Sequence, residues 1–442
     1  MFEKLFKLKE HGTTVRTELN AALATFMTMA YIIFVNPQIL SAAGMDVNAV
    51  MAATCISAAV ATIIMGLWAN YPIALAPGMG LNAYFAFTAV PYITEKLKAE
   101  GIDATSQAWQ VALAAVFVSG TFFLIITLFK IREKIINGIP DTIKYATAAG
   151  IGLFIAFIGL KGAGIVVANP ATFVSLGKFS ESPTLLAIAG LILISLLMIK
   201  KVKGSILIGI LATTAAGIAI GISDLPTSVF ALPDISPTFL KMDFTGLLAI
   251  GILDIIFVFL FVDMFDTIGT LIGVGEQGGF IKNGKLPRAS QAMTADAVGT
   301  MVGAVCGTST VTSYIESGAG VAEGGKTGLT SLFVGLFFIL ALFFAPIAGI
   351  IPAYATAPAL IIVGILMAGN VAKIKWTDMS DAIPGFFTLI MMPLTYSIAT
   401  GLTLGFILYP LCKLFAGKTK EVSVLVWILA LLFIARFVFL SV

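Results

Sequence analysis

The sequence contains very little charge. Only 11% of its 442 residues are Asp, Glu, Lys or Arg, and 59% are hydrophobic. Soluble globular domains carry roughly 25% charged residues. This composition excludes a soluble globular protein and predicts an all-α polytopic membrane protein whose surroundings are the lipid bilayer.

Histidine and cysteine are also scarce. The one histidine is His11, and Cys55, Cys306 and Cys412 lie far apart in the chain. This spacing matches neither a metal site nor a disulfide framework, so we expect no metal and no cofactor. The net charge of +3 gives no reason to expect nucleic acid as a partner, because the basic residues lie between apolar segments.

Long apolar segments fill most of the chain. A polar loop at 223–243 with three prolines separates them into two series of seven. The first series covers approximately 17–42, 48–69, 74–92, 108–130, 140–165, 184–200 and 203–222, and the second covers 246–273, 289–306, 308–322, 327–350, 354–371, 382–399 and 400–416. Each segment is treated as one predicted span.

The basic residues between the segments support this count. The N-terminal stretch MFEKLFKLKEHG is charged and has no cleavable signal pattern, so we place it in the cytoplasm. Most of the 26 Lys and Arg residues then lie on the cytoplasmic side; the exceptions are Arg436, in the last apolar stretch, and Lys96, Lys98, Lys161, Lys178 and Lys241 on the other side. The positive-inside rule thus predicts a multi-pass protein of the plasma membrane with fourteen spans.

The end of the chain has two possible arrangements. Val422–Leu440 is long enough to span the membrane, but Trp427 and Arg436 also suit a helix that lies at the membrane surface. The sequence leaves 421–442 as an apolar helix of either kind.

The two series of seven indicate an inverted repeat. Seven is odd, so the second series enters the membrane from the opposite side, and Lys203–Ala212 (KGSILIGILA) resembles Thr400–Tyr409 (TGLTLGFILY). The third segment of each half is interrupted, at Ala76–Phe87 (APGMGLNAYFAF) and at Gly307–Gly320 (GTSTVTSYIESGAG). Secondary transporters with inverted repeats bind their substrates near the membrane midplane, on interrupted helices.

Asp263, Asp266 and Glu316 are acids inside predicted spans, at the two places where the sequence interrupts an apolar run. Asp263 and Asp266 are three residues apart, so a helix places them on one face, and Glu316 lies in the glycine-rich break. Charged side chains at membrane depth are costly and usually mark a substrate or proton pathway. The structural alternatives are helix-end contacts or an ion pair for the two aspartates, and a half-helix cap for Glu316. No Lys or Arg lies between Lys241 and Lys282, so function is favoured.

Asn82 is the strongly polar side chain of the first break. Its amide both donates and accepts hydrogen bonds, which suits a ligand with mixed edges. Support of the broken backbone is an equally good explanation.

Two motifs of soluble enzymes also occur. Gly320–Thr327 (GVAEGGKT) matches the phosphate-loop pattern, and Gly273–Gly278 (GVGEQG) matches G-x-G-x-x-G. Both motifs need a strand before them and a helix after them in a nucleotide-binding domain. Here both adjoin membrane segments, so we expect a tight turn and a cytoplasmic Lys326 rather than nucleotide binding.

The stretches Ala76–Phe87, Asp266–Thr270 (DTIGT) and Gly307–Gly320 resemble signature sequences of the nucleobase–cation symporters, in the azaguanine-type branch of hypoxanthine, guanine and adenine permeases. The resemblance covers about Thr13 to Tyr409. It implies fourteen helices in a 7+7 inverted repeat, short β-strands in helices 3 and 10, and a homodimer. It also implies a core domain at 1–138 (helices 1–4) and 223–350 (helices 8–11), and a gate domain at 139–222 (helices 5–7) and 351–420 (helices 12–14).

The resemblance also implies a set of site residues. Asp266 or Asp263 matches the helix 8 acid that binds the base, Glu316 the helix 10 acid and Asn82 the helix 3 amide. The expected substrate-binding residues are Asn82, Ala83, Phe85, Asp263, Asp266, Ser313, Tyr314, Ile315 and Glu316. Related branches carry an ionisable residue four positions after the helix 8 acid, but Thr270 stands there, so Asp263, Asp266 and Glu316 are the expected proton-coupling residues.

The chemistry agrees with this function. A 6-oxopurine presents adjacent N–H donors that a carboxylate accepts strongly, and Phe85 or Tyr84 is placed to stack on the ring. We therefore expect import of purine nucleobases, hypoxanthine or guanine first, by proton symport. The alternatives are an adenine-preferring permease and an anion carrier of the same fold. An enzyme is not expected, because no acid–base constellation is assembled.

Overall fold

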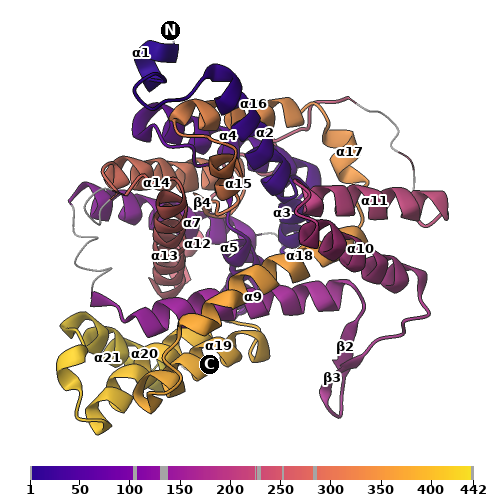
Figure 1. Cartoon of the computed structure of the whole chain (residues 1–442). Helices are drawn as coiled ribbons and strands as arrows, with labels where there is room; N and C mark the ends of the chain where they lie inside the picture. The colour runs from indigo at the N-terminus through magenta and orange to yellow at the C-terminus, as the bar shows by residue number, and fades with distance from the viewer. Residues whose placement is uncertain are drawn as a thin grey trace. The chain divides into compact units, whose positions relative to one another are not determined.

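The computed structural model describes residues 2–102, 107–129, 138–223, 225, 230–250, 253–281 and 286–439. The chain is mainly helical (Figure 1) and divides into two compact units. The first unit comprises Met1–Leu128 and Gly162–Ala359, and the second comprises Phe129–Lys161 and Leu360–Val442. The predicted assignment of segments to a core and a gate domain stays a prediction. Lys130, Arg132, Lys134, Lys282 and Lys285, which the topology prediction placed in cytoplasmic loops, lie outside the described residues.

The first unit contains most of the described helices and the four described strands. Its first part holds α1 (Phe2–Phe6), α2 (Val15–Met29), α3 (Ile32–Ser41), α4 (Val47–Ile64), the π-helix η1 (Met65–Ala69), β1 (Leu75–Pro77), α5 (Met79–Tyr84), the π-helix η2 (Phe85–Ala89), α6 (Val90–Ala99) and α7 (Ala108–Leu128). Its second part holds β2 (Val166–Asn169), β3 (Phe173–Leu176), α10 (Ser182–Ile199), α11 (Ser205–Ala219), α12 (Phe244–Ile250), α13 (Leu253–Gln277), α14 (Ala289–Cys306), β4 (Val311–Ser313), α15 (Ser317–Ala322), α16 (Gly328–Ala341) and α17 (Ala345–Gly349).

The second unit is built from fewer elements. It contains α9 (Asp141–Gly162, up to Lys161), most of α18 (Ala353–Ala368), the 3-10 turn η3 (Gly369–Lys373), α19 (Met379–Leu394), α20 (Ile398–Phe415), the 3-10 turn η4 (Thr419–Glu421) and α21 (Val424–Phe439). Figure 1 shows α19, α20 and α21 gathered together at the yellow end of the colour scale. The Phe406 ring of α20 lies 5.8 Å from the Phe433 ring of α21.

Some of the described helices have the length and composition of membrane spans. Eight of them, within the described residues, are long and apolar enough to cross a bilayer. The predicted first segment forms α2 and α3, which together run over Val15–Ser41. A β2–β3 hairpin, which the sequence analysis did not predict, follows α9 in the chain.

Short polar side chains begin several helices. At the first residue of a helix the backbone N–H groups have no partner within the helix, so a side-chain oxygen stabilises them. Thr14 accepts from the Thr17 amide at the start of α2, and Asp46 accepts from the Ala49 amide at the start of α4.

A buried ion pair lies within the second unit. Lys413 of α20 is only 1% exposed, and its Nζ lies 2.8 Å from Asp381 Oδ2 of α19. The Thr142 hydroxyl of α9 donates to the other Asp381 oxygen at 2.6 Å, and Glu421 accepts from Lys413 at 2.7 Å. These contacts hold three helices together, because each buried charge needs partners to offset its lost hydration.

We expect Lys413→Met to lower the melting temperature of the protein, because it leaves the Asp381 carboxylate buried and uncompensated. Breaking a buried pair from one side costs about 3–5 kcal/mol. The double variant Lys413→Met/Asp381→Asn should be more stable than Lys413→Met alone, since the substituted amide is neutral and its carbonyl oxygen can still accept from Thr142. A double variant as unstable as Lys413→Met, measured by thermal unfolding in detergent, contradicts this account.

Candidate functional site

The two predicted breaks meet as a two-stranded antiparallel sheet. β1 pairs with β4 in the register Leu75–Ser313, Ala76–Thr312 and Pro77–Val311. The strands that the resemblance implied are therefore present. At membrane depth an unpaired backbone N–H or C=O has no water to bond, so each break supplies the partners that the other lacks.

Hydrogen bonds beyond the strands complete this pairing. The Gly78 amide donates to the Thr310 carbonyl at 3.0 Å, and the Tyr314 amide donates to the Ala74 carbonyl at 2.9 Å. On the open edge of β1, the Thr62 hydroxyl bonds both the amide and the carbonyl of Leu75. The small sheet thus has its edges satisfied by side chains.

Thr300 does the same for the open edge of β4. Its hydroxyl bonds the Val311 amide and carbonyl, at 3.1 and 3.0 Å, and lies 3.1 Å from Asp263 Oδ2. A single hydroxyl group therefore connects the strand to an acid of α13.

Glu316 lies immediately before α15 and is half-buried. The Tyr31 hydroxyl, between α2 and α3, donates to its Oε1 at 2.6 Å. Its second carboxylate oxygen is not occupied by this bond. The predicted alternative, capping of a half-helix, has no support from the side chain, which makes no cap hydrogen bond to α15.

Asp266 is also half-buried, on the side of α13 that carries the exposed Gly269. The carboxylates of Asp266 and Glu316 are close enough to repel each other. A side chain on Gly78 would point at both Thr312 and Asp266: its Cβ would lie 2.7 Å from Thr312 Cγ2 and 3.8 Å from Asp266 Oδ2. Asp266 and Glu316 therefore form a pair of accessible acids beside the β1–β4 sheet.

A second pair of acids lies deeper. Asp263 is 1% exposed and Asp296 of α14 is 0% exposed, and the two interact electrostatically. Thr267 donates to Asp296 Oδ1 at 2.5 Å and also bonds Thr312 at 2.8 Å. Asp263 Oδ1 and Asp296 Oδ2 are both buried without a hydrogen-bond partner among the described residues. Carboxylate oxygens left in this way are costly unless a proton or cation reaches them.

Asn82 takes part in holding the break. It is fully buried on α5, its Oδ1 accepts from the Ser309 hydroxyl, and its Nδ2 lies 3.4 Å from the Pro77 carbonyl. These contacts agree with the backbone-supporting role that was left open. Its role in binding a base stays a prediction.

The predicted stacking residues pack against α13. Tyr84 and Phe85 are buried, and their rings lie 5.0 and 6.3 Å from the ring of Phe259. The tyrosines beside the accessible acids are Tyr31, which was not predicted, and Tyr314, which was predicted to bind the base.

The remaining predicted residues lie on both sides of the sheet. Ala83 is fully buried, Ser313 donates weakly to Asp296 Oδ1 at 3.4 Å, and the Tyr314 hydroxyl donates to the Pro77 carbonyl at 2.6 Å. Ile315 is 56% exposed. The structure therefore brings Asp266, Glu316, Tyr314 and Ile315 to one region, whereas the buried Ser313 contacts the deeper Asp296.

The sequence analysis missed Tyr31, Asp296 and the threonines Thr267 and Thr300, which connect the buried acids to the sheet. Asp296 could have been identified from the sequence, because it is an acid inside the predicted segment 289–306. Tyr31 and Thr267 could not, since a single tyrosine or threonine in an apolar helix is ordinary.

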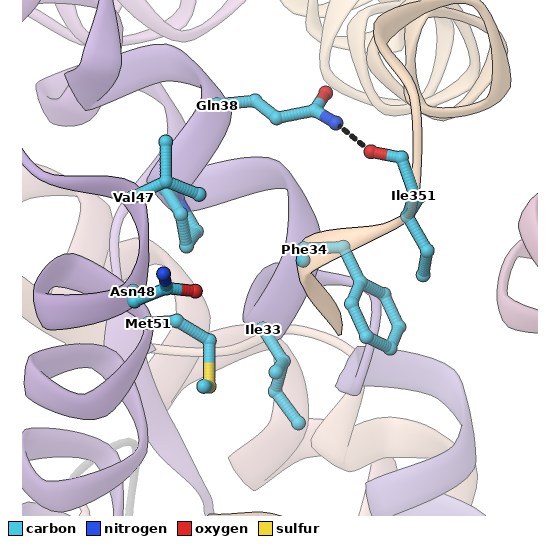
Figure 2. Close-up of a pocket in the computed structure, with 9 residues that line it drawn as sticks. Ile33, Phe34, Gln38, Val47, Asn48, Met51 and Ile351 are labelled. Atoms are coloured by element: carbon cyan, nitrogen blue, oxygen red, sulfur yellow. Dashed lines mark hydrogen bonds between the residues drawn. The ribbon is translucent and has the colours of Figure 1, made fainter. Parts of the chain in front are cut away.

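A separate small cavity lies between α3, α4 and the residues after α17. Its lining includes Ile33, Gln38, Asn48 and Met51, and Gln38 donates to the Ile351 carbonyl (Figure 2). Its volume is about 20 Å³, enough for roughly one water molecule and far below the roughly 300 Å³ of a small-molecule site. None of its lining residues is a predicted site residue.

Comparison with known proteins gives the family. Residues 16–404 match the model of a permease family. The chain belongs to this family. Together with the purine permeases among its relatives, this match confirms the resemblance to the nucleobase–cation symporters.

Two relatives agree with this assignment, and a solved structure shares the fold. The permease is 45% identical over 448 residues to the guanine/hypoxanthine permease PbuG of Bacillus subtilis, covering 99% of each chain. It is 44% identical over 442 residues to the adenine permease AdeP of Escherichia coli, covering 100% of this chain and 97% of the relative. The transmembrane domain of the cyanobacterial bicarbonate transporter BicA matches with a TM-score of 0.66 and 15% identity, over 88% of this chain and 96% of that chain, which shows a shared fold.

We expect Gly78→Ala to destabilise the permease, because the new methyl group would overlap Thr312 and push β1 away from β4. Overpacking of this kind costs about 1–3 kcal/mol. Gly269→Ala is the matched control, since nothing lies within 4 Å of its Cβ position. Melting temperatures measured in detergent should fall for Gly78→Ala and stay near the wild-type value for Gly269→Ala; equal values for all three proteins contradict the close approach.

Proposed function

We propose that the permease imports purine nucleobases across the plasma membrane by proton symport, with hypoxanthine and guanine as the preferred substrates. The names of the relatives support the substrate class, since they include guanine/hypoxanthine and adenine permeases. We further propose fourteen spans in a 7+7 inverted repeat, a cytoplasmic N-terminus, and a homodimer in which the core moves against the gate.

The observation that carries the substrate proposal is the accessible acid pair. Asp266 and Glu316 are half-buried beside a strand pair and form no ion pair within the described residues. Carboxylates accept hydrogen bonds from neighbouring N–H groups strongly. A 6-oxopurine offers such N–H groups along one edge, and guanine adds an exocyclic amine.

The buried acid pair supports the proton proposal. Asp263 and Asp296 each have an oxygen without a partner among the described residues, and their like charges repel. One proton between them removes the repulsion and supplies a donor. The Thr267 hydroxyl contacts both Asp296 and Thr312, so this proton site adjoins the sheet beside which Asp266 lies. Asp296 therefore joins Asp263, Asp266 and Glu316 as a proton-coupling residue.

Two other transport functions make different demands on the site. An adenine-preferring permease would use the same acids to bind a different edge of the base. A competition assay between adenine, guanine and hypoxanthine therefore distinguishes it from the proposed function. A carrier of anions needs positive charge or helix N-termini toward its substrate. The accessible residues here are acids, and the similarity to a bicarbonate transporter concerns the fold alone.

We expect cells that lack their own purine carriers to take up radiolabelled hypoxanthine when they express the permease. Guanine should compete, uracil and xanthine should not, and a protonophore should abolish accumulation because the proton gradient drives it. Competition by adenine alone would assign the adenine-preferring alternative. Absence of uptake for every base, despite surface expression, would contradict the proposal.

Glu316→Gln tests the role of the acid pair directly. The amide keeps the shape of the side chain but loses the charge that strengthens its hydrogen bonds to the base, a loss of about 1.5–3 kcal/mol or roughly 10- to 150-fold in affinity. Glu323→Gln is the matched control, because Glu323 ends the same short helix and pairs with Lys203 at the surface. Normal uptake by Glu316→Gln in a transport assay would remove Glu316 from the site.

A further inference from the structure

The last residues of the phosphate-loop motif follow α15, and their backbone amides bind a carboxylate of the protein itself. Glu18 of α2 is 0% exposed and lies more than 300 residues before this loop in the sequence. Its Oε1 accepts from the Lys326 amide at 3.0 Å, and its Oε2 accepts from the Thr327 amide at 3.3 Å. Successive backbone N–H groups that converge in this way bind phosphate in nucleotide-binding proteins.

Thr330 completes the set of donors. Its amide lies 3.2 Å and its hydroxyl 2.6 Å from Glu18 Oε2. Among the described residues Glu18 forms no ion pair, so these four hydrogen bonds stabilise the buried carboxylate. Hydrogen bonds to a charged group are the strong ones, which makes the arrangement sufficient without a cation.

Glu18, Asn70 and Thr327 together supply acceptors for the free backbone N–H groups in the first turn of α16. Thr327 is its N-cap, the Gly328 amide donates to Asn70 Oδ1 at 2.7 Å, and the Leu329 amide lies 3.4 Å from the Thr327 hydroxyl. The Glu18 carboxylate accepts a hydrogen bond from the Thr330 amide. A negative charge at a helix N-terminus is further stabilised by the helix dipole.

Glu18 begins a continuous contact between α2 and α15. Ala21 and Thr25 follow it on the same face of α2, and both approach Gly320 so closely that a Cβ there would overlap them. Thr28, one turn further on, lies 3.4 Å from the Glu316 carbonyl. This face of α2 therefore contacts α15 from the loop after it to the acid before it.

We infer that residues 325–330 form an internal carboxylate-binding site whose ligand is Glu18, and that this contact positions α15 and with it Glu316. Glu18 is a positioning residue: it fixes the end of α15 opposite to the one that Tyr31 holds. The loop thus binds the protein's own carboxylate where nucleotide-binding proteins bind phosphate.

Chemical rescue tests the carboxylate site without reference to transport. Glu18→Ala removes the ligand and leaves the Lys326 and Thr327 amides without an acceptor among the described residues, so its melting temperature in nanodiscs should fall by several degrees. Sodium acetate, which matches the atoms that the substitution removes, should recover most of that loss. Acetamide and sodium chloride should not. Glu323→Ala, the matched control, should show no such recovery.

A Glu18→Ala protein that folds but gains nothing from acetate overturns the carboxylate site. If Glu18→Ala does not fold, the inference is tested with Glu18→Gln. This variant keeps the size of the side chain but places an amide N–H₂ group against backbone N–H donors. Hydrogen exchange at 317–330 should then be faster than in the wild type, whereas Glu323→Gln should leave it unchanged. Wild-type exchange in Glu18→Gln overturns the inference.

The positioning role rests on the proposed function and has its own measurement. Hypoxanthine binding per folded molecule should weaken about tenfold in Glu18→Gln, because Glu316 is less well held. A role in stability alone would lower the amount of folded protein and leave this affinity unchanged. If the wild type binds no purine, the proposed function fails, while the rescue by acetate still tests the site.

Discussion

The antiparallel contact between β1 and β4 is the interaction on which the site depends. Each strand is a break in an apolar segment, and neither break could leave its amides and carbonyls unpaired inside a membrane. The pairing of Ala76 with Thr312 solves this problem for both segments at once. It also places an acid-bearing loop, a helix start and α13 around one small region, which no continuous helix would do.

Hydroxyl groups extend this arrangement into the surrounding helices. Thr62 and Thr300 each bond both polar groups of one strand residue, and Thr267 connects β4 to Asp296. A threonine hydroxyl both donates and accepts, so it satisfies a backbone group and an acid with one side chain. The result is two pairs of acids with different surroundings: Asp266 and Glu316 at a partly open face, and Asp263 and Asp296 enclosed by threonines.

Buried carboxylates recur elsewhere with different partners. Asp381 in the second unit has a lysine and a threonine, and Glu18 in the first unit has backbone amides and Thr330. Both are fully satisfied and hold helices together. Asp263 and Asp296 each keep an oxygen without a partner among the described residues. The difference in hydrogen-bond satisfaction separates structural acids from those that we assign to transport.

The sequence by itself determined the class of protein, the family, the two breaks and the importance of Asp263, Asp266 and Glu316. These conclusions follow from local composition, since an acid or a glycine-rich stretch is conspicuous in an apolar helix. Only the tertiary structure decided the hydrogen-bond partners: Tyr31 for Glu316, Ser309 for Asn82, and Glu18 for the loop whose sequence matches the phosphate-loop pattern. Each of these pairs joins residues more than 200 positions apart, and a hydrogen bond over that separation leaves no mark on the spacing of either residue.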